Sequence, residues 1–221
     1  MATAQDLIDE SLAILGTYDA GGSPSSAERA SDLKTLNFMR QSLAMEPGFQ
    51  AKSEDNFTLS PGIVTYDWYN SSAANFSGLP AIKLTDVYAS FNLIDYPLRG
   101  MSWAEVAQLT DKNYRTGIPD RYFYEQIMTT GWFSLYPAPS ISGDIVIASI
   151  KAPSALVLSG DVDEPGQVLE ALIWNLSVRL APKYGVRITP EIAATAVTSM
   201  QRVKLSRMDD TVRVRGDRNF L

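Results

Sequence analysis

The segment from residue 161 to residue 207 constrains the fold more than any other part of the chain. Its first periodic run predicts a helix with two apolar stripes. One stripe, repeating at i, i+3, i+4, i+7 and i+11, consists of Leu169, Leu172, Ile173, Leu176 and Leu180. The second, on roughly the opposite side at 100° per residue, consists of Val168, Ala171, Trp174 and Val178. A helix that is apolar on two sides has to be covered on both. One side is therefore expected to face the chain's own core, and the other a further layer or another copy of the chain.

The remaining periodicity predicts helices at both ends of the chain and strands between them. Long helices are expected over residues 3–16, 24–46, 167–182 and 190–207, and capping boxes mark the first two starts. Alternating residues between about 55 and 151 predict a hairpin across Pro61 and Gly62, an irregular strand near Asp86, and strands over 121–127, 132–136 and 144–150. The expected fold class is α+β: a bundle of long N- and C-terminal helices with a central antiparallel β region. This predicts one domain over residues 1–207 and an extended tail over 208–221.

Composition excludes several classes of chemistry. The chain has neither cysteine nor histidine, which rules out disulfides, thiolate metal sites and nucleophiles that depend on histidine. The net charge is −6, but residues 202–221 hold six basic and three acidic residues, so that end carries +3 and the remainder −9. An acidic body does not bind nucleic acid tightly, because affinity for phosphates comes from lysine and arginine. We expect no membrane span and no secretory signal, because no run of eighteen apolar residues and no basic, then apolar leader is present.

Two groups of carboxylates are candidates for chemistry. Glu105 and Asp111 could form a general acid–base pair, but Glu105 also completes a capping box with Ser102. A second cluster, which could bind calcium or stabilise the start of the following helix, consists of Asp161, Asp163 and Glu164. The capping interpretation is favoured for both groups, so no catalytic residue, metal ligand or cofactor is assigned.

Aromatic residues provide candidates for stacking on a ligand. Trp174 and Tyr184 lie on or just after the helix with two apolar stripes, and packing is the favoured interpretation. The runs at residues 122–124 and 132–133 could form a platform for nucleic-acid bases. Few lysines or arginines accompany these runs, so packing is favoured there as well.

Six segments carry a recognisable pattern. Five of them lie within residues 2–39, 57–66, 96–105, 116–119 and 135–139, and the sixth is Ala171-Leu-Ile-Trp-Asn-Leu-Ser-Val-Arg-Leu-Ala-Pro-Lys-Tyr-Gly185. In this order the six segments resemble the head-to-tail adaptor family of tailed phages, which includes the adaptor, or tail accessory factor, of short-tailed phages. The sixth segment is the most specific match. The resemblance extends from residue 2 to about residue 207. The central strand region is longer than in the smallest members of the family.

The resemblance implies a structural virion protein and not an enzyme. Family members form a ring, usually of twelve copies, that docks beneath the portal protein in the neck of the virion and holds the tail or nozzle proteins. The ring extends the channel through which the genome leaves, and an acidic body would let DNA pass without sequence-specific binding. Assembly is expected in the host cytoplasm, with no membrane partner and no cofactor.

Two surfaces follow as candidate sites. The stripe of Val168, Ala171, Trp174 and Val178 is expected to contact a neighbouring subunit. The stripe of Leu169, Leu172, Ile173 and Leu176 then faces the subunit's own bundle, and the reverse assignment of the two stripes stays open. The C-terminal tail is expected to order against the portal, because its alternating residues can add as a strand or lie extended in a groove. Its predicted contacts are Val212, Arg213, Val214, Arg215, Arg218, Phe220 and Leu221. The alternatives are a virion-associated cell-wall hydrolase that uses Glu105 and Asp111, and a DNA-binding module that uses the basic tail.

Overall fold

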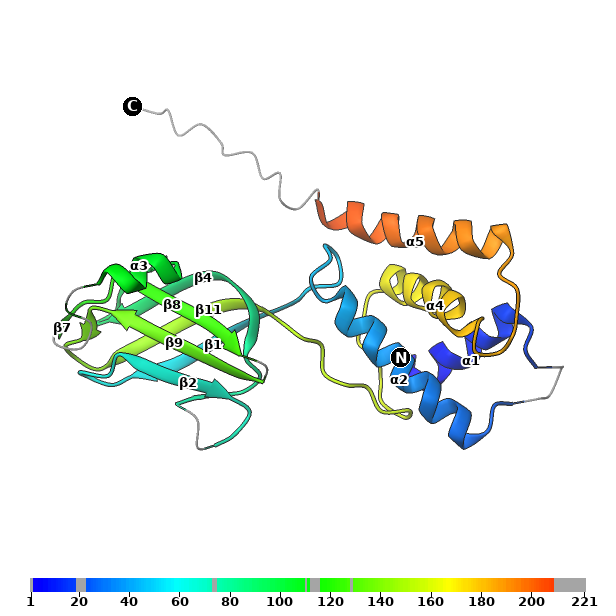
Figure 1. Ribbon diagram of the computed structural model, residues 1–221, viewed down its shortest axis with the longest axis horizontal. Coiled ribbons are helices and arrows are strands. Elements are labelled where there is room, and N and C mark those ends of the chain that lie inside the picture. Colours follow the sequence, from blue (N-terminus) through cyan, green and yellow to red (C-terminus); the bar gives the residue numbers. More distant parts are fainter. Residues whose placement is uncertain are drawn as a thin grey trace, which may run out of the picture. The chain divides into compact units, whose positions relative to one another are not determined.

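The chain divides into two compact units (Figure 1). The computed structural model describes residues 2–18, 23–72, 75–109, 111, 116–127 and 129–208. Residues up to 50 and from 153 onward form one unit, here called the helical unit, and residues 51–152 form the other, the β unit. Within the described residues, no helix is both long enough and apolar enough to cross a membrane.

The helical unit contains α1, α2, α4 and α5, which are Ala4–Leu15, Ser26–Leu43, Gly166–Leu180 and Pro190–Met208. Each of these helices lies within one of the four ranges expected from periodicity, apart from a single residue at one end of α4 and of α5. Reciprocal hydrogen bonds form the capping boxes at Thr3 and Ser25, where the side chains of Asp6 and Glu28 bind the cap backbone. These contacts satisfy amide groups that a helix start leaves free.

Helix α4 is the centre of the helical unit. It contacts α1 and α2 on one side and α5 on another, and Figure 1 shows it between them. The core is made of aliphatic side chains from all four helices, including Leu7, Ile8, Leu12, Leu36, Met39, Leu172, Leu176, Leu180 and Val203. The second apolar side of α4 therefore has its covering layer within the same chain.

The β unit holds two larger sheets and one small one. The four-stranded sheet has the order β1-β11-β4-β5 and is antiparallel throughout; its strands are Ala51–Leu59, Gly143–Lys151, Ala81–Phe91 and Ile94–Pro97. The five-stranded sheet has the order β3-β2-β9-β8-β6; its strands are Phe76–Ser77, Thr65–Tyr69, Thr130–Tyr136, Arg121–Ile127 and Arg99–Gly100. The small sheet pairs β7, Thr116–Gly117, with β10, Ala138–Pro139. A short helix, α3, covers Trp103–Gln108.

The β unit has its own core, which is rich in aromatic rings. Phe76 stacks on Phe57 with ring centroids 4.2 Å apart and lies 5.6 Å from the ring of Phe133. Both larger sheets contribute buried side chains, among them Leu59, Tyr66, Trp68, Val87, Ala89, Leu135, Ile145 and Ile147. The alternation of buried and exposed residues along β1, β2 and β9 reflects a sandwich with one inward face per sheet. Strand β11 differs, because Ile145, Val146 and Ile147 are buried in succession.

The expected fold class is wrong. Over the described residues the chain is a mixed α/β protein with 35% helix and 32% strand, and it is not a bundle of long helices carrying an antiparallel region. Among the described strands, β2–β3, β6–β8 and β7–β10 pair in parallel. The strands build a separate core because their inward rings pack on each other.

The predicted hairpin across Pro61 and Gly62 is also wrong. Strand β1 pairs with β11, whereas β2 pairs with β9 in the other sheet. The turn therefore carries the chain from one sheet to the other. The irregularity predicted near Asp86 is confirmed: Ala148 is opposite Asp86 and Ser149 is opposite Leu84, so the intervening residue is the extra one of a bulge.

Candidate functional site

The stripe of α4 that was expected to contact another subunit is split by burial. Val168 is 5% exposed and Ala171 is fully buried, and both belong to the core of their own unit. These two side chains cannot reach a neighbouring subunit, so the expectation is wrong for them. Trp174 and Val178 are half-buried and remain candidates. The side chain of Asn175 donates to the carbonyls of Ala171, at 2.8 Å, and of Ala196 on α5, at 3.1 Å, which joins the two helices.

The outward face of α5 is mostly uncharged. One lysine lies within it, Lys204, whose ammonium pairs with Glu46 at 2.7 Å, and the exposed Glu191 and Arg202 border it. At 100° per residue, the exposed residues of this face fall within one arc, and they are Ala193, Ala194, Val197, Thr198, Gln201 and Leu205. Val197 is 57% exposed and Leu205 is 64% exposed. The opposite arc holds the buried Ala196, Ser199 and Val203. A solvated helix usually carries mainly polar and charged residues on its outer face. Because apolar Val197 and Leu205 lie near the middle of this face, it replaces the α4 stripe as the candidate interface.

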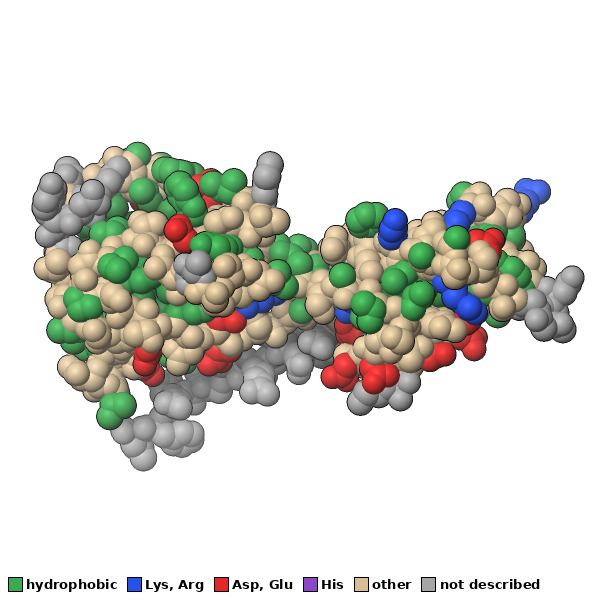
Figure 2. All heavy atoms as spheres, turned by 90° about the horizontal axis from the view of Figure 1, so that it is seen from below, with side chains coloured by type: hydrophobic (Ala, Val, Ile, Leu, Met, Phe, Trp, Pro, Cys, Tyr) green, Lys and Arg blue, Asp and Glu red, His purple; other side chains and the backbone are tan. Residues whose placement is uncertain are grey.

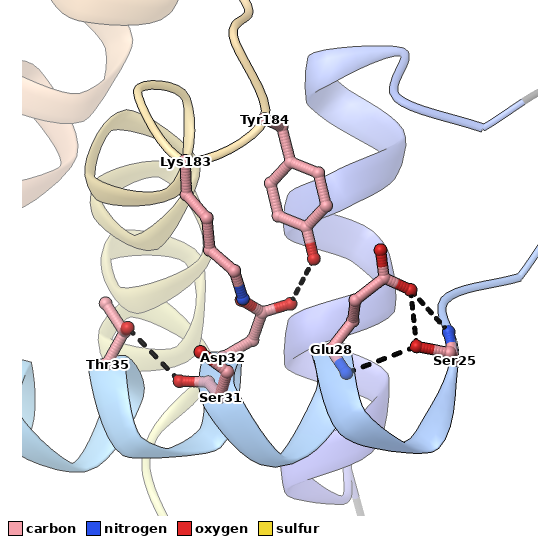
Figure 3. A network of polar contacts seen from close by, with 7 residues as sticks. All are labelled: Ser25, Glu28, Ser31, Asp32, Thr35, Lys183 and Tyr184. Atoms are coloured by element: carbon pink, nitrogen blue, oxygen red, sulfur yellow. Dashed lines mark hydrogen bonds and ion pairs between the residues drawn. The ribbon is translucent and has the colours of Figure 1, made fainter.

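A buried carboxylate lies where the most specific matching segment ends (Figure 3). Asp32 on α2 is fully buried, and its two oxygens accept from Lys183 Nζ at 2.5 Å and from the Tyr184 hydroxyl at 2.6 Å. Lys183 and Tyr184 come from the turn that follows α4, and Gly185 adopts a φ of 65° there. The contacts join α2 to this turn, and we call the three residues the Asp32 clamp.

The electrostatics of the Asp32 clamp follow from its burial. Burial, and then the hydrogen bond to the Asp32 carboxylate, raise the pKa of Tyr184 above its ordinary value. Lys183 Nζ also lies 5.2 Å from the centre of the Tyr184 ring, within cation–π range. Because each carboxylate oxygen is engaged by a side chain of the same subunit, the arrangement acts as a structural link. Sequence reasoning identified Tyr184 as a packing residue and missed Asp32 and Lys183.

The candidate acid–base pair is not supported by the geometry around Glu105. Its carboxylate accepts from the Ser102 amide at 2.7 Å and pairs with Arg99 at 2.5 Å. The hydrogen bond from the Ser102 backbone is the main reason why the pKa of Glu105 lies below its usual range. An ionised cap is poorly suited to donate a proton, and Asp111 is simply exposed. The structure therefore favours the capping interpretation.

The candidate calcium cluster is spread over separate contacts. Asp161 forms an isolated backbone bridge with Thr3, Asp163 is exposed, and Glu164 pairs with Arg40 at 3.4 Å. Across the part of the chain that the structure describes, no three acidic side chains are close enough to hold a metal ion.

The aromatic runs of the β unit divide between its two faces. Tyr122 and Tyr124 pack against the core, which includes Phe133, so the packing interpretation holds for them. Trp132 lies on the outer face and is 48% exposed. Asp67 and Glu125 are its register partners on the two neighbouring strands. Directly opposite residues share a face, so two carboxylates flank this ring. That arrangement does not suit a surface for nucleic-acid phosphates.

An apolar pocket of about 190 Å³ lies between α3 and the outer face of the five-stranded sheet. Trp103 at the start of α3 contacts the ring of Phe123 at 4.9 Å and donates to Glu125 at 3.3 Å. The pocket is lined by Val64, Thr65, Met101, Val106, Leu109, Phe123, Ser134, Leu135 and Tyr136. We call it the α3 pocket. No residue of α3 is fully buried, so the helix covers the sheet only partly.

The β unit also exposes a hydrophobic turn, and hydrophobic side chains are visible on the face of this unit in Figure 2. Leu93 is completely exposed at the turn between β4 and β5, and Ile94 is 55% exposed.

The predicted portal contacts, from Val212 to Leu221, lie outside the described residues. The geometry thus offers three candidate surfaces: the outward face of α5, the α3 pocket and the β4–β5 turn. No protein-family model matches the chain, and no curated protein matches it either.

Proposed function

We propose that this chain is the subunit of a head-to-tail adaptor ring in a tailed phage. The ring docks beneath the portal protein, extends the DNA channel and provides the attachment site for tail proteins. The observation that carries the proposal is the ordered resemblance of six segments between residue 2 and about residue 207. The segment over residues 171–185 is the most specific of them.

The structural role of that segment supports the proposal. Residues 171–180 form most of α4, the central helix of the helical unit, and Lys183 and Tyr184 complete the Asp32 clamp. The matching residues of this segment therefore determine how the helices pack. The match in this segment speaks for a shared fold of the helical unit, which is the part that would form the ring.

The outward face of α5 supports self-association. Val197 and Leu205 would each bury apolar area against a neighbour, and interfaces are depleted of charge at their centres. Ring closure requires a heterologous contact, in which one surface of a subunit meets a different surface of the next. Phe38 on α2, which is 67% exposed, offers an apolar contact on another helix. We assign α5 and α2 as the two sides of the subunit contact.

The proposal is tested by mixing the purified full chain with the portal protein of the same virion and measuring the mass of the particles formed. We expect a discrete complex that contains one ring of this chain per portal. A chain that stays monomeric and does not bind the portal would overturn the proposal. The free chain being monomeric would not, since ring closure can require the portal as a template.

Two variants locate the surfaces involved. Val197→Asp should abolish the ring while leaving the fold intact, because a charge would be buried at the contact. Val157→Asp is the matched control, since Val157 is 64% exposed in the same unit but lies outside α5. Deleting residues 209–221 should leave folding unchanged and prevent stable docking. If the shortened chain docks as well as the full chain, the tail is not the anchor.

A further inference from the structure

We infer that the β4–β5 turn of one subunit inserts Leu93 into the α3 pocket of a second copy of this chain. The inference concerns the β unit, which the resemblance leaves without a role. It rests on the proposed ring for the choice of a second copy as the partner. Four observations carry it: the backbone of the turn, its exposure, the size of the pocket and the charges beside each.

The backbone of the turn is unusual for the residues that it contains. Phe91 pairs with Ile94, so Asn92 and Leu93 form a two-residue loop with φ values of 52° and 64°. Turns with two positive φ values favour Asn followed by Gly, because a side chain is strained at the second position. Asn92 fits this preference, whereas Leu93 occupies the position that favours glycine.

Packing against the described residues does not compensate for this strain. The Leu93 side chain is completely exposed, and Ile94 beside it is 55% exposed. A strained residue that gains no packing in its own fold indicates a role outside that fold. A leucine at the tip of a hairpin is an apolar knob, and its natural partner is an apolar pocket.

The α3 pocket matches that knob in size and chemistry. An apolar cavity of about 150 Å³ is large enough to hold benzene, so a pocket of about 190 Å³ can accommodate the four-carbon side chain of a leucine. Met101, Val106 and Phe123 provide its apolar wall. Because Leu93 is fully exposed, it does not fill the pocket of its own subunit.

Acidic residues accompany the knob. Asp95 follows it on β5 and is paired in register with Ser90, which is paired in turn with Asp144. Residues directly opposite each other share a face, so Asp95 and Asp144 lie on one face of the sheet, on either side of Ser90, and both are exposed.

Arginines accompany the pocket. Arg121 is the register partner of Tyr136, which lines the pocket, and Arg99 is the partner of Arg121 on the next strand. Their side chains are 45% and 73% exposed, although each pairs with one carboxylate of its own chain. A guanidinium has five N–H donors, so both arginines can bind a further carboxylate. The charges at the knob and at the pocket are therefore complementary.

The knob and the pocket are different surfaces of the same unit, so the contact is heterologous and leaves a free knob and a free pocket at its ends. Such contacts continue from copy to copy and close where the rotation allows a ring. This is the kind of contact that the proposed adaptor requires, and it would give the β unit a part in the ring.

Disulfide cross-linking tests the contact cleanly, because the chain contains no cysteine. Full-length Leu93→Cys and Val106→Cys variants are purified separately, mixed at high concentration and oxidised. We expect the mixture to form a linked dimer at least tenfold faster than either variant alone. Leu93→Cys mixed with Val157→Cys, an exposed position in the other unit, is the matched control. Equal rates for the two mixtures would overturn the inference.

A second variant separates a role in assembly from a role in folding. Leu93→Gly relieves the strained turn and removes the knob, so its melting temperature should equal or exceed that of the wild type. Its association into rings on the portal, followed by sedimentation, should be weaker than that of the wild type. Association equal to the wild type would refute the contact. A ring on the portal that shows no link between positions 93 and 106 would overturn this contact alone, whereas absence of the ring would overturn the proposed function.

Discussion

Replacing Lys183 with methionine should destabilise the helical unit through the carboxylate that it leaves behind. The Asp32 side chain is completely buried, whereas that of Lys183 is 34% exposed. In the variant, Asp32 would keep only the hydrogen bond from Tyr184 for a charge that water cannot reach. Removing one partner of a buried ion pair costs about 3–5 kcal/mol. Because the lysine is partly solvated, we expect about 3 kcal/mol, at the lower end of that range.

The other two members of the Asp32 clamp should respond differently. Tyr184→Phe keeps the ring in the core and removes a hydrogen bond to a charged group, which should cost about 2 kcal/mol. Asp32→Asn keeps the shape and an acceptor for the tyrosine, and it removes the buried charge, so about 1–2 kcal/mol is expected. The double variant of Asp32→Asn with Lys183→Met leaves no uncompensated charge. Its cost should be at least about 1 kcal/mol less than the sum of the two single variants.

The assay is chemical denaturation followed by far-ultraviolet circular dichroism, which reports mainly on the helices. The two units can unfold separately, so the helical transition has to be fitted by itself. Lys34→Met is the matched control: Lys34 is an exposed lysine on α2, and its replacement should stay within about 0.5 kcal/mol. Additive costs in the double variant, or a loss for Lys183→Met no larger than for Lys34→Met, would refute the reasoning.

Three further changes have defined outcomes. Gly48→Ala should destabilise the helical unit by about 2 kcal/mol or more, because φ is +92° and a Cβ would lie 2.6 Å from Val203 Cγ1; a denaturation midpoint equal to the wild type would contradict this. Burial raises the pKa of Tyr184 above 10.0, so its stabilisation is complete below about pH 10 and is lost as the pH rises further; the stability of Tyr184→Phe should fall less steeply there, and parallel curves would argue against it. The pKa of Glu105 is lowered, so its stabilisation is present above pH 4.5 and disappears as the pH falls; Glu105→Gln should weaken α3 at neutral pH and lose less in acid, as measured by hydrogen exchange of the Ser102 amide.

The helices were largely predictable from sequence because their signals are local. The capping box at Thr3 is completed by Asp6, three positions later. The apolar residues of α4 repeat within one or two turns of the helix. The covering of α4 by α5 was not predictable, because the buried arc of α5 consists of Ala196, Ser199 and Val203 and carries little hydrophobic signal. The sequence pattern alone therefore does not distinguish α5 from another subunit as the cover of the second apolar side of α4.

The arrangement of the strands was not predictable for a related reason. Strand β1 has its partner, β11, some ninety positions later in the sequence, and the pattern of β1 itself does not reveal that partner. Strands β3, β6, β7 and β10 have two residues each, which is too short for any alternation. The sequence does contain a signal for the Asp32 clamp. Asp32 lies on the same buried face of α2 as Leu36 and Met39, and a carboxylate on a buried face requires a partner.

The central claim, that this chain forms a ring between the portal and the tail, is tested most directly by cryo-electron microscopy of the neck of the virion that carries it. We predict a closed ring of copies coaxial with the portal. The outward face of α5 should be covered by the next copy, and residues 209–221 should lie against the portal. A neck in which this chain is absent, or present as a single copy without contacts between copies, would contradict the claim.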